Sequence, residues 1–172
     1  ERRAIQLSLL PGVSTNGPIA GAVVNEVSVN VFAGFARGLD GLEVGGGANL
    51  LSHNMKGAQI AGIGNLVGGT VQGVQLAGGV NHSMRAMRGV QVAGISNTVW
   101  DTLSGVQIAG GVNLVKRGMT GTQLSGAANA AIGDLNGVQV SGGANVATGV
   151  VNKTQVSGAL NYAKAVKGAQ VT

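Results

Sequence analysis

The chain has 172 residues, of which 44% are hydrophobic, 10% charged and 2% aromatic, and its formal net charge is +5. This hydrophobic fraction excludes a disordered chain, and the absence of cysteine excludes disulfides, thiol catalysis and cysteine-based metal sites. The positive charge favours anionic surroundings such as lipopolysaccharide, lipid headgroups or nucleic acid, without choosing among them.

The first 40 residues lie outside the repeat that fills the rest of the chain. Residues 4–10 alternate in polarity, which predicts a strand. Residues 11–18 hold both prolines together with glycine and asparagine, a composition typical of a loop. Residues 27–36 alternate again and predict a second strand. We expect residues 1–40 to form an N-terminal cap and residues 41–172 to form a repeat array, because terminal repeats are usually atypical.

A sixteen-residue unit recurs through the array, and its clearest copy reads GVQIAGGVN at residues 105–113. When the leading glycine is numbered slot 1, slot 3 is glutamine and slot 9 is asparagine. The glutamines are Gln59, Gln75, Gln91, Gln107, Gln123, Gln139 and Gln155. The asparagines are Asn49, Asn65, Asn81, Asn97, Asn113, Asn129, Asn145 and Asn161. A period this regular indicates a supersecondary unit that cannot fold alone and must stack on its neighbours.

The remaining slots divide the unit into two short strands. Slot 4 is always aliphatic, slot 5 always small, slot 6 always glycine and slot 15 always apolar. β-Branched residues and alternation within VQIA and VNLV favour strands, and the paired glycines of slots 6 and 7 disfavour helix. We predict a strand, a glycine bend at slots 6–7, a second strand and a wider bend at slots 12–16. Roughly four or five aliphatic side chains of each unit are expected to be buried.

Two all-β architectures accommodate this unit. In a β-solenoid each unit is one coil, and about eight coils stack roughly 4.8 Å apart, so that identical slots form ladders. In an antiparallel transmembrane β-barrel, slots 2–11 form one strand of about ten residues, a bilayer-crossing length. We favour the solenoid, because only parallel stacking explains why slot 9 is asparagine in every copy. The aromatic girdles of membrane barrels are also missing from the sequence.

The glutamine and asparagine columns have two interpretations. They can present amides to a ligand, or each amide can donate to the carbonyl oxygen of the same residue one coil away, as in cross-β ladders. We favour the structural ladder. Glu43 supports it, since this residue occupies slot 3 of the first copy, where a carboxylate at the end of the stack costs less than one within it.

Eight of the eleven basic residues fall in or beside the wide bend: Lys56, Arg85, Arg88, Lys116, Arg117, Lys153, Lys164 and Lys167. We call this set the basic edge, because stacking aligns its members at separations within a Debye length of about 10 Å. One interpretation is a stripe that binds an anionic polymer or lipid headgroups. The other, which we favour, is a solvated margin that keeps an apolar array soluble and prevents aggregation. Nucleic acid is not expected as a partner.

No consistent set of residues indicates catalysis. His53 and His82 occupy different slots, so stacking does not align them, and the aspartates have no histidine or nucleophile at a fixed spacing. Neither a GxxxxGKS/T phosphate loop nor the aspartates of calcium-binding nonapeptide repeats occur. We therefore expect a protein that is not an enzyme and uses no cofactor or metal.

The unit GVQxAGxxN, with the preceding segments QLSLLPGVSTNG at 6–17 and VSVNVFAGFARGLDGLEVGG at 27–46, resembles bacterial surface-repeat proteins with tandem GVQ-AG-VN segments. The resemblance covers nearly the whole chain and implies an exported protein at the bacterial cell surface or outer membrane, with no catalytic residues. A looser likeness to curlin repeats, which space glutamine and asparagine within glycine-rich units, suggests self-assembly.

These features together predict a rigid scaffold or interaction surface whose partners are other copies of the chain or other surface proteins. Residues 168–172 supply only the first strand of a further coil, so end-to-end joining is part of this expectation. An outer-membrane pore and an anion-binding module that uses the basic edge are the alternatives.

Overall fold

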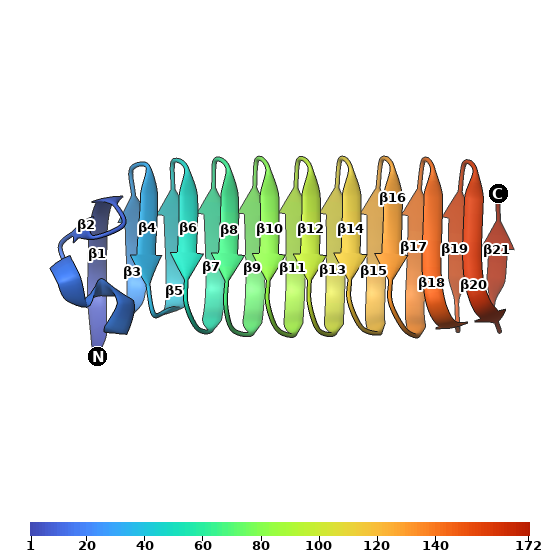
Figure 1. The fold of residues 1–172 in the computed structure, drawn as a ribbon, viewed down its shortest axis with the longest axis horizontal. Coiled ribbons are helices and arrows are strands. Elements are labelled where there is room, and N and C mark those ends of the chain that lie inside the picture. Colours follow the sequence, from blue (N-terminus) through green and yellow to red (C-terminus); the bar gives the residue numbers. More distant parts are fainter.

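The chain winds into an elongated β-solenoid of about nine turns in a computed structural model that describes residues 1–172 (Figure 1). Neighbouring coils pair in parallel, and identical slots face each other, as Gln91 does with Gln75 and Gln107. The solenoid predicted from the repeat is therefore confirmed. The antiparallel barrel is wrong, because after sixteen residues each strand runs in the same direction as the equivalent strand of the preceding coil, as β9 does beside β7.

Two sheets face each other across the interior, and Figure 1 shows them as a front row and a fainter rear row of strands. The odd-numbered sheet contains β1 (Arg2–Leu10), β3 (Val24–Asn30), β5 (Gly38–Gly45), β7 (Met55–Ala61), β9 (Val71–Ala77), β11 (Met87–Ala93), β13 (Leu103–Ala109), β15 (Met119–Ser125), β17 (Leu135–Ser141), β19 (Thr154–Ser157) and β21 (Ala169–Val171). The even-numbered sheet contains β4 (Ala33–Ala36), β6 (Ala48–Leu51), β8 (Gly64–Val67), β10 (Val80–Ser83), β12 (Ser96–Val99), β14 (Val112–Val115), β16 (Ala128–Ala131), β18 (Ala144–Val151) and β20 (Leu160–Val166).

The wide bend is shorter than predicted, because slot 15 in most coils begins the next strand. β7, for example, starts at Met55 in slot 15 and passes through Gly57 before it reaches Gln59. Gly57 has a φ of +114°, and a Cβ there would overlap the carbonyl oxygen of Gly41 in the preceding coil. Only glycine combines this φ with such a close approach, which explains why the repeat unit has glycine in slot 1. Slots 12–14 remain as the bend.

The interior has an apolar half and a polar half. Slots 11 and 15 supply most of a continuous cluster of 15 buried residues, whose largest side chains include Met55, Met87 and Leu103. Slots 3 and 9 supply the polar half, where the slot 3 glutamines up to Gln155 and the slot 9 asparagines up to Asn145 are at most 1% exposed. The solenoid therefore buries amides as systematically as it buries aliphatic groups.

The slot 4 side chains lie on the outside, so the expectation of four or five buried aliphatic groups per coil is wrong. Val44, Ile60 and Ile108 are 38–39% exposed. Successive side chains of a strand point to opposite faces of the sheet. An inward amide in slot 3 therefore places the aliphatic residue of slot 4 outside.

Residues 1–40 continue the solenoid with irregular coils. β1 pairs in parallel with β3, and β3 pairs in parallel with β5, so the boundary expected at residue 40 falls inside β5. The strand expected at residues 27–36 is divided between β3 and β4. The loop expected at residues 11–18 contains β2 (Val13–Ser14), which pairs antiparallel with β1, and the start of a 3₁₀ helix, Gly17–Ala22. No helix of the structure has the length and apolar composition needed to span a membrane.

Candidate functional site

The slot 3 side chains form one unbroken ladder of hydrogen bonds. Each glutamine donates from Nε2 to the side-chain oxygen of the residue one coil nearer the N-terminus, at 2.6–2.9 Å from Gln170 to Glu43. Where slot 11 is alanine, Nε2 also lies 3.3–3.4 Å from a main-chain carbonyl oxygen of the opposite sheet, as Gln139 does from Val146. The structural ladder predicted for the glutamines is confirmed.

The slot 9 asparagines form a second ladder that runs in the opposite direction. Each Nδ2 donates to the Oδ1 of the asparagine one coil nearer the C-terminus, at 2.9–3.0 Å from Asn49 to Asn161. Nδ2 also donates to the slot 4 carbonyl oxygen of the next coil, as Asn113 does to Leu124 at 2.7 Å. Asparagine thus connects two coils and both sheets, which explains why every copy keeps it.

Glu43 and Asn30 join the two ladders at their N-terminal end. Glu43 accepts a hydrogen bond from Gln59 at 2.8 Å through one carboxylate oxygen and one from Asn30 at 2.9 Å through the other. Asn30 also donates to Asn49 at 2.8 Å and so begins the asparagine ladder. Because two donors converge on residue 43, this position suits a carboxylate, which only accepts when it is ionised.

Glu43 is fully buried, although the repeat pattern placed it at an open end of the stack. β3 covers it, with Ser28 in the equivalent slot. Burial raises the pKa of the Glu43 carboxyl above its ordinary value, and hydrogen bonds from Gln59, Asn30 and Ser28 offset part of this effect. The convergent donors stabilise this carboxyl in place of water.

The repeat pattern does not reveal Asn30, because this residue precedes the first regular copy. Asn30 pairs with Gly45, which puts it in slot 5 of its coil. Slot 9 of the same coil is Gly34, and a Cβ on Gly34 would overlap the Asn30 amide. The Asn30 side chain therefore occupies the space of the missing slot 9 side chain. A glycine in slot 9 beside an asparagine in slot 5 is the signal that could have identified it.

Replacing Glu43 by glutamine is expected to remove one component of the pH dependence of stability. A carboxyl whose folded-state pKa is raised stabilises the fold fully below its unfolded pKa of about 4.3, and this contribution is lost as pH rises through the folded pKa. Denaturant unfolding between about pH 4 and pH 8 should show E43Q gaining stability relative to the wild type as pH rises.

Met87→Ala is the control for this measurement, since it lowers stability without changing a titratable group. Its free energy of unfolding should differ from that of the wild type by a constant amount across the pH range. If the difference between E43Q and the wild type is equally constant, residue 43 does not titrate differently in the folded and unfolded chains.

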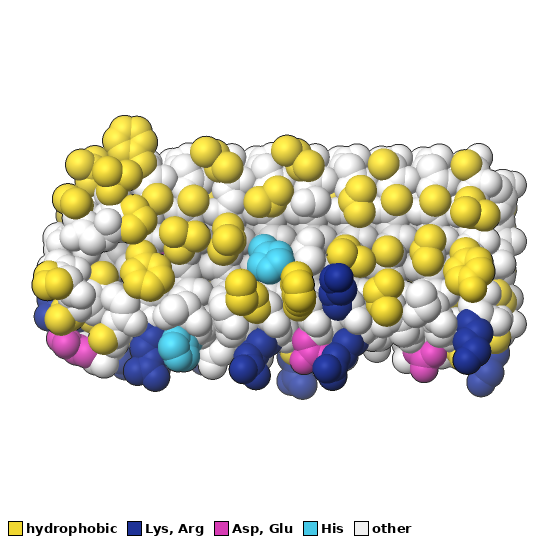
Figure 2. All heavy atoms as spheres, in the orientation of Figure 1, with side chains coloured by type: hydrophobic (Ala, Val, Ile, Leu, Met, Phe, Trp, Pro, Cys, Tyr) yellow, Lys and Arg dark blue, Asp and Glu magenta, His cyan; other side chains and the backbone are white.

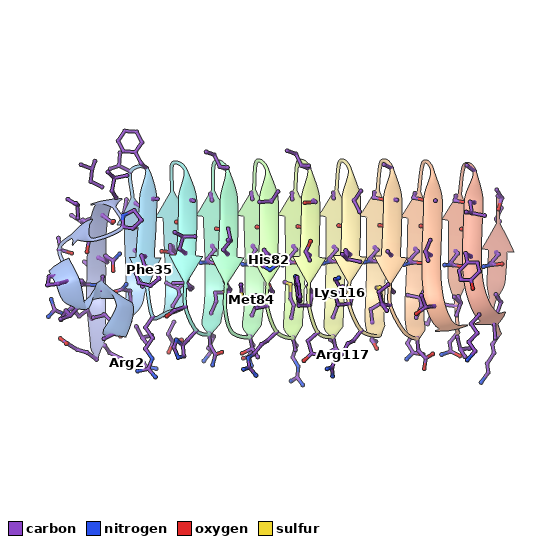
Figure 3. All side chains as sticks on the ribbon, viewed as in Figure 1. Arg2, Phe35, His82, Met84, Lys116 and Arg117 are labelled. Carbon is purple, nitrogen blue, oxygen red and sulfur yellow. The ribbon has the colours of Figure 1, made fainter.

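The basic edge follows the wide bends, and Figure 2 shows Lys and Arg side chains along one long side of the rod. All eight of its predicted members are exposed. Lys56 and Arg117 lie 3.9 Å and 3.6 Å from the carboxylates of Asp40 and Asp101. Lys116 departs from the set, because its Nζ lies 5.0 Å from the ring centre of Trp100 and the side chain rests on the face of the even-numbered sheet (Figure 3).

Two polar grooves open between the wide bends near the N-terminal end of the basic edge. The first, of about 420 Å³, is lined in part by Arg2, Arg37, Asp40, His53 and Lys56. The second, of about 450 Å³, shares His53 with the first, includes Arg85 and has no hydrophobic residue in its lining. Guanidinium and ammonium groups such as those of Arg37, Lys56 and Arg85 suit the oxygen atoms of an anion.

A cluster on the face of the even-numbered sheet is also absent from the sequence-based prediction. Trp100 is 54% exposed, and its ring centre lies 6.0 Å from that of His82, edge to face. Burial lowers the pKa of His82. Met84, Trp100 and Lys116 follow one another at intervals of sixteen residues in slot 12, and this spacing is the signal that could have grouped them.

The two histidines lie in different parts of the molecule. His53 lies in the grooves of the basic edge, whereas His82 lies on the even-numbered sheet (Figure 3). No group of three His, Asp or Glu side chains is close enough together to hold a metal ion. No protein-family model, curated protein or solved structure matches the chain.

Proposed function

We propose that this protein is a non-catalytic structural scaffold of the bacterial cell surface, a rigid rod whose partners are further copies of the chain or other surface proteins. The observation that carries the proposal is the pair of buried amide ladders that run through the regular coils without interruption. Because these amides are inaccessible to a ligand, the most regular feature of the sequence serves the fold. The resemblance to surface-repeat proteins supports the location.

Rigidity is expected from the way each coil is held to the next. Main-chain hydrogen bonds number 137 in 172 residues, and the two amide ladders and the slot 11 and 15 rows add to them. Bending the rod would separate coils on one side and leave buried donors without acceptors. Each such group costs about 1–3 kcal/mol. A rod of this kind suits a spacer or a display surface better than a hinged binding protein.

The surface location is tested with one thiol introduced into the cysteine-free chain. Ser104 is exposed in slot 16 of β13, so Ser104→Cys provides a single site for a membrane-impermeant maleimide. Intact bacteria that produce the full-length protein should label as strongly as lysed cells. Labelling that appears only after lysis would overturn the location.

Ala93→Cys is the matched control for this labelling, because Ala93 is buried in slot 5 of β11. This thiol should react only after denaturation, in intact and lysed cells alike. The comparison shows that the Ser104→Cys signal comes from folded protein.

Anion binding by the basic edge is the second candidate function, and the two polar grooves favour it. Heparin, used as a soluble polyanion, should bind less tightly at about 200 mM salt than at about 50 mM, by roughly tenfold or more. Combined replacement of Lys56 and Arg85 by glutamine should weaken binding and reduce the salt dependence. A flat salt response would exclude this function.

Lys116→Gln is the matched control for heparin binding, since it removes one positive charge from the neighbouring face and leaves the grooves unchanged. If this variant weakens binding as much as a single replacement at Lys56 or Arg85, heparin responds to net charge and the grooves are not a specific site.

A further inference from the structure

The outer surface of the odd-numbered sheet carries two continuous apolar rows. Slot 4 is aliphatic in all eleven strands, from Leu7 in β1 through Val92 in β11 to Val171 in β21. Slot 2 runs beside it from Ile5, and its only polar members are threonines. We call the two rows the aliphatic face. It contains no charged and no aromatic residue.

These side chains remain in contact with solvent in the single chain. Leu7, Val29 and Ile60 are 53%, 44% and 39% exposed. The amides of slot 3 occupy the interior of the same strands, so alternation leaves the aliphatic rows no place inside the solenoid. Contiguous exposed apolar surfaces of several hundred Å² usually mark interaction sites.

The aliphatic face is large and flat enough for a stable interface. Eleven strands about 4.8 Å apart extend over roughly 50 Å, and two rows of side chains are about 12–15 Å wide. The product, on the order of 600–750 Å², approaches the roughly 800 Å² per partner of a standard protein interface. Figure 1 shows the strands nearly parallel along the whole rod, so a straight partner can contact the entire length. Two strongly twisted sheets would contact each other over only part of the length of the rod.

We propose that the aliphatic face is the interface of a homodimer in which two copies pack sheet against sheet. The side chains of this face repeat about every 4.8 Å along the rod, and a second copy supplies ridges with the same spacing. Dry, interdigitated packing between such identical arrays holds the paired sheets of steric zippers about 10 Å apart. A two-fold contact of this kind is self-complementary and closed.

Other features of the surface favour a second copy over a membrane as the partner. They also favour the odd-numbered sheet over the even-numbered sheet as the interface. Aromatic side chains, which anchor proteins at the bilayer interface, are absent from the aliphatic face. The even-numbered sheet presents His82, Thr98 and the ammonium of Lys116, which a sheet-to-sheet contact would desolvate. Lys56 and Arg88, in slot 16, border the aliphatic face and can stay hydrated at its rim, as charged residues do in interfaces.

The homodimer rests on one part of the proposed function, namely that the scaffold binds further copies of the same chain. Its test is the mass of the purified chain in solution, which is independent of surface labelling. Sedimentation equilibrium at about 10–200 µM should show the wild type at twice its monomer mass of 16.9 kDa. Val92→Lys, at the middle of slot 4, should raise the dimer dissociation constant at least about tenfold, because an unpaired ammonium would be buried.

Thr98→Lys is the matched control, since Thr98 lies in the same coil on the opposite sheet and is comparably exposed. This variant should dimerise like the wild type. A wild type that stays monomeric at about 200 µM overturns the proposal whether or not Val92→Lys folds. Equal dissociation constants for the two lysine variants also overturn it. Binding of the monomer to neutral phosphatidylcholine vesicles, with no dimer, would assign the aliphatic face to lipid instead.

Discussion

Asn113→Leu is expected to destabilise the solenoid by on the order of 5 kcal/mol, because it interrupts the asparagine ladder in the middle of the array. Asn113 donates to Asn129 at 2.9 Å and to the Leu124 carbonyl oxygen at 2.7 Å, and it accepts from Asn97 at 2.9 Å. Leucine has a similar size but removes all three hydrogen bonds. Asn97 keeps its bond to the Ile108 carbonyl oxygen, so the loss is one bond at each of three buried groups, at about 1–3 kcal/mol each. Denaturant unfolding monitored by circular dichroism measures the loss.

Asn136→Leu provides the same chemical change at an exposed position in β17, where the amide accepts a solvent-exposed hydrogen bond from Asn152. Surface substitutions of this kind usually alter stability by about 0.5 kcal/mol or less. If Asn113→Leu costs no more than Asn136→Leu, the buried amides do not hold the coils together, and the structural argument for a rigid scaffold fails with them.

Gly105→Ala is expected to destabilise the chain by about 3 kcal/mol or more, through strain and close contact between coils. Gly105 has a φ of +147°, and a Cβ there would overlap the carbonyl oxygen of Gly89 one coil before. Relief of this contact requires two coils to move apart, which stretches the main-chain bonds and the ladders beside them. Thermal and denaturant unfolding should both detect the change.

Gly12→Ala separates the backbone strain from the contact between coils, the two contributions to the loss of stability expected for Gly105→Ala. Gly12 also has a positive φ, +87°, but no atom lies within 4 Å of a Cβ built on it. Its replacement should cost only the backbone strain, about 1 kcal/mol. Equal losses for the two variants would mean that coil spacing tolerates a slot 1 side chain. The eighth copy has Lys153 in place of the slot 1 glycine. In that copy β19 starts only at Thr154, so slot 1 lies outside the strand.

The stacking of like residues follows from the sequence because a constant period permits little else. If each coil uses sixteen residues and the strands within each sheet run in one direction, residue i+16 lies over residue i, as Gln75 lies over Gln59. The ladder partners were predictable for this reason. The basic edge follows from the same rule, whereas the position of Lys116 over Trp100 depends on the direction in which a slot 12 side chain leaves the bend.

The irregular coils show what a repeat pattern does not contain. Gln6 and Ser8 alternate with Ile5 and Leu7 in the strand predicted near the N-terminus, but the polar residues point inward and the aliphatic residues outward. Alternation identifies a strand without identifying its buried face, and hydrophobicity alone would choose the opposite face. The junction at Glu43 also depends on these coils, since Asn30 reaches it from outside the regular array.

The amino-acid sequence by itself determined the coil length, the parallel order of the strands and the columns of identical side chains, because these follow from translation by one constant period. Only the tertiary structure decided which face of each strand is buried, in which direction each amide ladder runs and where the ladders meet. Those features depend on how both sheets share one narrow interior. There, every amide must find a partner, and the aliphatic residues of the alternate positions face outward.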